Sequence, residues 1–125
     1  MTIPTVPTLL TGAVVGATAA ANLSIAAADL LRARFVLDNS AEVNVPARWL
    51  PALAAAKGAG GAGVALWFLD VPVLPIVSAA GLACFFVGAN VAHLRARVFH
   101  NIAFPGTYLA LAAGSLALLV LDTSS

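Results

Sequence analysis

The chain has 125 residues, of which 62% are hydrophobic and only 9% are charged, and its net charge at pH 7 is +1. A water-soluble domain carries about 25% charged residues, so this composition, with a mean hydropathy of +1.01, argues against a soluble globular protein. The sequence has no cluster of basic residues of the kind that binds phosphates, so nucleic acid is not expected as a partner.

Four long apolar runs follow one another along the chain, at about residues 7–31, 49–69, 71–92 and 104–121. A run of roughly 18 or more apolar residues predicts a membrane-spanning helix, because about 20 residues at 1.5 Å each cross a hydrocarbon core of ~30 Å. The runs lack the alternation typical of barrel strands, and backbone groups in lipid must bond within their own segment. The sequence therefore predicts an all-α polytopic membrane protein, a four-helix bundle in a lipid bilayer that forms a single domain over residues 1–125.

The arginines indicate the orientation of this bundle. They lie in the connection between the first and second runs or directly after the third run, at Arg32, Arg34, Arg48, Arg95 and Arg97. By the positive-inside rule, both connections are cytoplasmic and both termini lie on the outer side. The Ala-rich, Arg-over-Lys composition suggests a high-GC bacterium, and we expect a multi-pass protein of the bacterial cytoplasmic (inner) membrane. The mixed stretch 35–48 is either a short interfacial helix or an extension of the first span, and its sequence leaves both open.

Small residues recur at helical spacing in three of the runs. Such faces allow the close backbone contact that supplies packing energy between helices in lipid. The sets are Gly12 and Gly16 in the first run, Ala54, Gly58 and Ala62 in the second, and Ala80, Cys84, Gly88 and Ala92 in the third. Together they predict a tight bundle in which Cys84 is a packing residue.

Polar residues within the spans are the most specific indication of function. A charged side chain at mid-bilayer costs at least about 2.5–3.5 kcal/mol, so such residues usually face the bundle interior and need partners. With the predicted orientation, polar side chains from all four runs fall in the cytoplasmic half, at Asn22, Asp29, Lys57, Asn90, His93 and Tyr108. We predict that these residues line one ligand-binding pocket.

Most of these residues also have a purely structural interpretation. Asp29 can pair with Arg32 one turn along its own helix. Lys57 can extend its ammonium group to the headgroups, and His93 can lie at the interface. Asn22 can bond to a neighbouring helix without any ligand.

The predicted pocket suggests a particular chemistry. Asp29 and Lys57 are its natural ion pair. His93 is suited to exchange a proton near neutral pH, and Asn90 and Tyr108 offer neutral hydrogen bonds. Such a site suits a lipophilic molecule with one polar end, such as a quinone or an isoprenoid. No metal site is predicted, since two histidines and one mid-span cysteine do not converge at ligand spacing.

Several segments resemble the DoxX-like family of small four-span bacterial membrane proteins. The resemblance rests on residues 45–51 (VPARWLP), 55–63 (AAKGAGGAG), 85–89 (FFVGA), 92–97 (AHLRAR) and 104–105 (FP). It extends from about residue 29 to residue 121 and implies a compact four-helix membrane bundle. The family takes its name from a subunit associated with quinol oxidation, and related members are linked to oxidoreductase complexes or to the assembly of other membrane proteins. The resemblance supplies no catalytic residues.

Three classes of function remain open. The first is an accessory subunit that binds a lipophilic small molecule in the polar pocket, within a homo-oligomer or a larger membrane complex. The second is a membrane-embedded enzyme that uses Asp29 or His93 as general acid or base on an apolar substrate such as an epoxide or a terpene. The third is an assembly or chaperone partner of another membrane protein. The convergence of polar residues favours the first.

Overall fold

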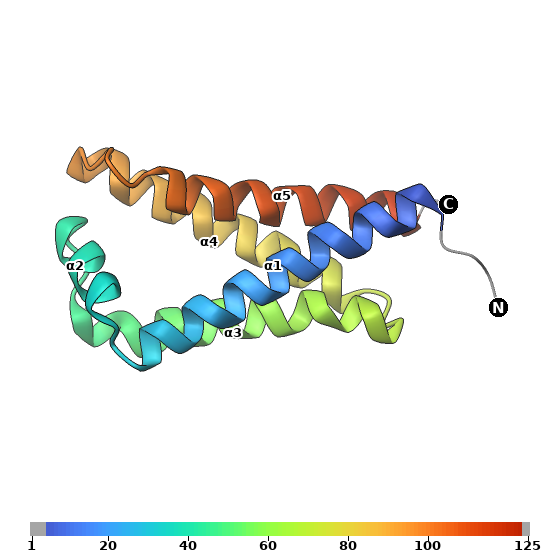
Figure 1. The fold of residues 1–125 in the computed structure, drawn as a ribbon, viewed down its shortest axis with the longest axis horizontal. Coiled ribbons are helices and arrows are strands. Elements are labelled where there is room, and N and C mark those ends of the chain that lie inside the picture. The colour runs from blue at the N-terminus through green and yellow to red at the C-terminus, as the bar shows by residue number, and fades with distance from the viewer. Residues whose placement is uncertain (1–4, 124–125) are drawn as a thin grey trace.

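The computed structural model describes residues 5–123, and every regular element in that range is a helix (Figure 1). Four helical segments are long and apolar enough to cross a membrane, and the second of them combines an α-helix with a 3-10 turn at each end. In chain order the elements are α1 (Val6–Leu30), α2 (Arg34–Glu42), η1 (Ala47–Trp49), α3 (Leu50–Ala65), η2 (Leu66–Leu69), α4 (Leu74–Ala96) and α5 (Ala103–Thr123). The prediction of an all-α protein with four apolar spans is confirmed.

The chain leaves α1 at Arg32, whose φ of 53° lies in the left-handed region and interrupts the helix. The backbone N–H of Ala33 donates to the carbonyl of Ala28 at 3.0 Å and closes the last turn. The next helix, α2, starts directly afterwards. The stretch 35–48 is therefore mostly a separate short helix, and it does not extend the first span.

Two further left-handed residues end helical segments. Asp70, with φ 60°, ends η2, and the chain then passes through Pro72 before α4 begins at Leu74. Arg97, with φ 57°, ends α4. The third membrane span, α4, thus runs from 74 to 96, because the residues from 71 to 73 belong to the turn.

The two ends of the bundle differ in what they carry. The start of α1, the end of α5 and the turn between η2 and α4 lie at one end (Figure 1). The other end carries α2 and the connection between α4 and α5, and we call it the α2 end. The basic residues of both connections are gathered there, namely Arg32, Arg34, Arg48, Arg95 and Arg97. That the α2 end is cytoplasmic stays a prediction.

The four spans form a ring in which each helix contacts two neighbours. The pairs are α1 with α3, α3 with α4, α4 with α5, and α5 with α1. The core between them contains Val15, Val64, Leu82 and Leu119, all at most 2% exposed. Polar bonds add to this packing, because the hydroxyl groups of Thr18 and Ser115 lie 2.8 Å apart between α1 and α5.

Glycines allow α3 to approach both of its neighbours closely. On one side, a Cβ added at Gly61 would lie 3.1 Å from Cβ of Asn22 on α1. On the other side, a Cβ added at Gly63 would collide with Ser78 of α4. The small residues of the second span therefore serve two helix contacts at once.

The prediction that the small residues of the third span form a packing face is not met. Cys84 is exposed, and a Cβ added at Gly88 would have no described atom within 4 Å apart from its chain neighbours and the backbone of its own helix. Instead, α4 packs through the larger buried side chains Leu82 and Phe86 together with Ala79. The spacing of small residues did not predict this contact face correctly, because the same spacing also occurs on helix faces that no neighbouring helix covers.

Candidate functional site

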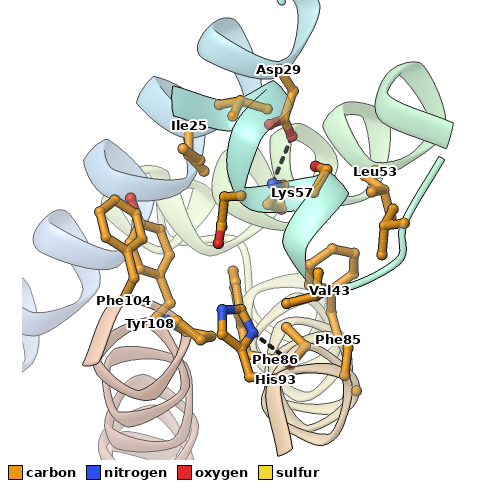
Figure 2. A pocket seen from close by; sticks show the side chains of 18 of the residues that line it. Ile25, Asp29, Val43, Leu53, Lys57, Phe85, Phe86, His93, Phe104 and Tyr108 are labelled. Atoms are coloured by element: carbon orange, nitrogen blue, oxygen red, sulfur yellow. Dashed lines mark hydrogen bonds and ion pairs between the residues drawn. The ribbon is translucent and has the colours of Figure 1, made fainter. Parts of the chain in front are cut away.

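A cavity of about 540 Å³ opens among the helices at the α2 end (Figure 2). Its volume lies within the ~300–1,000 Å³ typical of small-molecule sites. Residues of α1, α2, α3, α4 and α5 line it, and the lining is mainly apolar, with aromatic side chains at Phe35, Trp49, Phe85, Phe86 and Phe104. Such a wall accommodates an apolar molecule and leaves recognition to a few polar groups.

The first polar group is an ion pair between two spans. The ammonium nitrogen of Lys57 on α3 lies 2.6 Å from Oδ2 of Asp29 on α1, and the two side chains are 11% and 2% exposed. Lys57 also lies 5.7 Å from the centroid of the Phe85 ring, a cation–π distance. Asp29 is thus paired across helices. Arg32 points elsewhere and donates to the Ala47 carbonyl at 3.4 Å.

The second polar group is the imidazole of His93, which is 3% exposed on α4. Its Nδ1 lies 3.0 Å from the carbonyl oxygen of Ala89, one turn back along the same helix. Its Nε2 has no hydrogen-bond partner among the described residues. In Figure 2, His93 lies on one side of the cavity, and the Asp29–Lys57 pair lies on the opposite side. The cavity therefore has two polar points separated by apolar wall.

Tyr108 also lines the cavity, but its hydroxyl group is already engaged. It donates to the carbonyl of Ala21 on α1 at 3.2 Å. Its ring stacks on Phe104, with centroids 5.6 Å apart, and contacts Phe86 at 5.1 Å. Tyr108 thus supplies an aromatic wall that is fixed in place by α1.

The two predicted asparagines do not line the cavity. Asn90 donates to the carbonyls of Phe86, at 2.7 Å, and Pro105, at 3.0 Å, and so joins α4 to α5. Asn22 is fully buried and donates to the Thr18 carbonyl at 2.9 Å, while its Oδ1 has no partner among the described residues. The structure therefore brings together Asp29, Lys57, His93 and Tyr108 and places Asn22 and Asn90 between helices.

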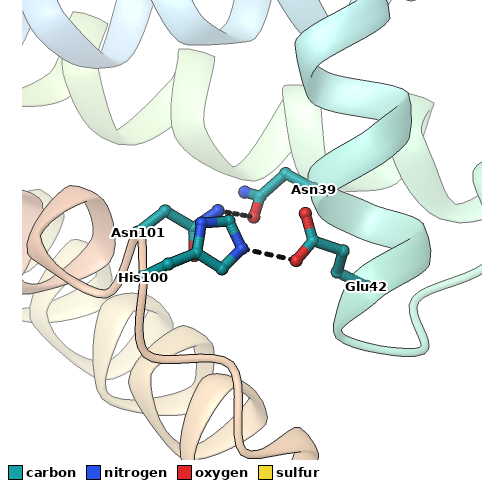
Figure 3. Close-up of polar contacts among 4 residues, drawn as sticks. All are labelled: Asn39, Glu42, His100 and Asn101. Carbon is teal, nitrogen blue, oxygen red and sulfur yellow. Dashed lines mark hydrogen bonds and ion pairs between the residues drawn. The ribbon is translucent and has the colours of Figure 1, made fainter.

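The sequence did not single out α2 as part of the site. This helix lies at the end of the bundle and contributes Val36, which is 5% exposed, and Asn39 to the lining of the cavity. Nδ2 of Asn101 donates to Oδ1 of Asn39 at 2.8 Å, and Nε2 of His100 lies 2.6 Å from Oε2 of Glu42 (Figure 3). The signal in the sequence is the apolar character of 35–37, which a solvated loop would not need.

No group of three or more His, Cys, Asp or Glu side chains within residues 5–123 is arranged to hold a metal ion. The titratable groups of the described cavity wall, apart from the bonded Tyr108 hydroxyl, are two charged side chains in contact with each other and one imidazole, and Asn39, Ser40 and Asn101 add neutral polar groups. This arrangement can bind the polar end of an organic molecule and can exchange a proton at Nε2 of His93.

Comparison with known proteins identifies a family. The model of the DoxX-like family matches residues 13–115, which include all six residues predicted for the site. Comparison with curated proteins and with solved structures gives no match.

Proposed function

The chain belongs to the DoxX-like family and is a multi-pass integral membrane protein, and we propose that it binds a lipophilic small molecule of the quinone or isoprenoid type in the cavity at the α2 end. In this proposal it is an accessory subunit of a membrane redox or lipid-linked system, in the bacterial inner membrane and with the α2 end in the cytoplasm.

One observation carries this proposal: a mainly apolar cavity of about 540 Å³ contains a buried ion pair and a buried imidazole nitrogen without a partner. Small-molecule sites combine a mainly apolar wall with a few placed polar groups, which fix the orientation of the ligand. An apolar chain fits between the aromatic side chains, and a polar end fits near Lys57 or His93. Buried polar groups without such a ligand are costly in a membrane.

An acid–base enzyme is the second candidate, and the position of His93 favours it. A general base needs a free lone pair within reach of the substrate. Asp29 is held by Lys57, whereas Nε2 of His93 is without a partner among the described residues. In this alternative His93 is the base, and replacing it by glutamine abolishes turnover while binding persists.

The proposal is tested by native mass spectrometry of the protein released from mild detergent. We expect the wild type to carry a bound lipophilic molecule and to take up an added isoprenoid alcohol or a prenylated quinone in its reduced, hydroquinone form. Ala92 lines the cavity and is replaced by phenylalanine to fill it. Ala113 is exposed on α5, and its replacement by phenylalanine is the matched control.

The two variants give opposite expectations. The Ala92→Phe protein should lose the bound molecule, and the Ala113→Phe protein should retain it. Equal retention by both variants would contradict binding in this cavity.

A further inference from the structure

We infer that the ligand presents a hydroxyl group to Nε2 of His93, so that its polar end is an alcohol, a phenol or a quinol rather than a ketone, an ether or a quinone. This inference rests on the proposed function and specifies the chemical class that the same cavity selects.

The tautomer of His93 is set by its own helix. The partner of Nδ1 is the carbonyl oxygen of Ala89, at 3.0 Å, and a carbonyl oxygen can only accept a hydrogen bond. Nδ1 therefore carries a hydrogen. A neutral imidazole has a single N–H, so Nε2 is left with its lone pair and acts as an acceptor.

No described residue donates to this acceptor, although it is buried. Among the donors of the cavity wall, the Tyr108 hydroxyl bonds to Ala21, one N–H of Asn101 bonds to Asn39, and the Lys57 ammonium is paired with Asp29 on the opposite side of the cavity from His93. A buried acceptor without a donor is unfavourable, and a donor on the ligand relieves that cost. The missing group is therefore an O–H or N–H on the bound molecule.

A hydroxyl group fits the remainder of the wall better than an amine. Phe85, Phe86 and Phe104 surround the space with aromatic carbon, which suits a neutral, lipophilic molecule. The one carboxylate of the described lining, Asp29, is already paired with Lys57, so a ligand ammonium group would be buried in the cavity without a carboxylate of its own. A ketone, an ether or a quinone would place an oxygen lone pair against the lone pair of Nε2. A site with a polar group to satisfy rejects the analogue that cannot satisfy it.

The test uses two matched pairs of probes and the full-length protein in detergent. The first pair is farnesol and its methyl ether, and the second is a prenylated hydroquinone and its dimethyl ether, both kept under anaerobic conditions. Binding is followed by tryptophan fluorescence, because Trp49 lines the cavity. We expect the hydroxyl member of at least one pair to bind at least about tenfold more tightly than its ether, since one hydrogen bond is worth that factor. The pair that binds more tightly distinguishes an isoprenoid alcohol from a quinol.

Two substitutions assign the selectivity to His93. Glutamine keeps an oxygen acceptor near the position of Nε2, so His93→Gln should retain most of the preference for the hydroxyl probe. Leucine has no acceptor, so His93→Leu should bind alcohol and ether with similar affinity.

The possible outcomes separate this inference from the proposed function. Equal affinity of the wild type for both members of each pair would overturn the hydroxyl inference and leave the ligand-binding proposal standing. Failure of all four probes to bind saturably would overturn both. Retention of the full preference by His93→Leu would overturn the role given to Nε2.

Discussion

Lys57 on α3 and Asp29 on α1 form an ion pair of 2.6 Å in the wall of the cavity, at the level where α1 and α3 pack together. Each charge offsets the unfavourable burial of the other, because an isolated charge in this environment would be strongly unfavourable. The pair therefore positions two helices of the site as well as contributing a charged wall to it.

Removing one member of this ion pair should destabilise the protein more than removing both. Lys57→Met leaves the Asp29 carboxylate buried without its partner, so we expect a loss of about 3–5 kcal/mol in the free energy of unfolding. The double variant Asp29→Asn, Lys57→Met should recover most of that loss. Reversible unfolding in mixed micelles with SDS measures both quantities. A double variant less stable than either single variant would contradict the pairing.

Replacing a glycine by alanine should lower the stability of the protein in α3 but not in α4. Gly63→Ala places a methyl group where it collides with the Ser78 side chain, so we expect the free energy of unfolding to fall by about 1–3 kcal/mol. Gly81→Ala places its methyl group where no described atom lies within 4 Å apart from its chain neighbours and the backbone of its own helix. The better helix propensity of alanine should leave the protein unchanged or up to about 1 kcal/mol more stable. The same unfolding assay compares the two variants, and equal effects would contradict the α3–α4 contact.

The hydroxyl contact between Thr18 and Ser115 should couple α1 to α5. Thr18→Val keeps the shape of the side chain and removes the 2.8 Å hydrogen bond, along with the bond from Thr18 to the Val14 carbonyl. We expect a coupling energy with Ser115→Ala of about 0.6 kcal/mol and at most about 1.7 kcal/mol. A double-mutant cycle in the unfolding assay isolates this value, and additive effects would show that the contact does not contribute.

α2 should act as a cover that the ligand has to pass. Asn39 of α2 bonds to Asn101 in the connection between α4 and α5 at 2.8 Å, and both residues line the cavity. A short thiol-reactive cross-linker between cysteines introduced by Asn39→Cys and Asn101→Cys, in a Cys84→Ser background, should slow release of a bound farnesol at least about tenfold. The reference is the same variant without cross-linker. Unchanged release after cross-linking would indicate another route, for example between helices from the lipid.

The sequence predicted the features that depend on the free-energy penalty for placing polar or charged groups in lipid. The four spans follow from the length of their apolar runs, and the pairing of Asp29 with Lys57 follows from the penalty for an isolated charge. Their residue types alone carry that information. The structure has the four apolar spans, and of the two partners considered for Asp29, Lys57 and Arg32, it pairs Asp29 with Lys57.

Other features depend on choices that residue type does not settle. Asn90 and Asn22 were predicted to bind a ligand, but an amide on a helix can donate to the carbonyl four residues before it, and both do so. The position of α2 against the cavity depends on the left-handed turn at Arg32, which a sequence pattern does not reveal. The free nitrogen of His93 depends on a side-chain rotamer. The bonding of the two asparagines, the position of α2 and the free nitrogen of His93 therefore follow from the structure and not from the sequence.

The central claim is that the cavity at the α2 end holds a lipophilic ligand, and photolabelling tests it most directly. A farnesol analogue with a diazirine in its chain is added to the protein in native-like vesicles, and the labelled residues are identified by mass spectrometry. We expect labels on cavity residues such as Phe35, Phe85 and Ala92, suppressed by an excess of unlabelled farnesol. Labels spread over exposed side chains such as Leu9 and Val77, and unaffected by that excess, would contradict the claim.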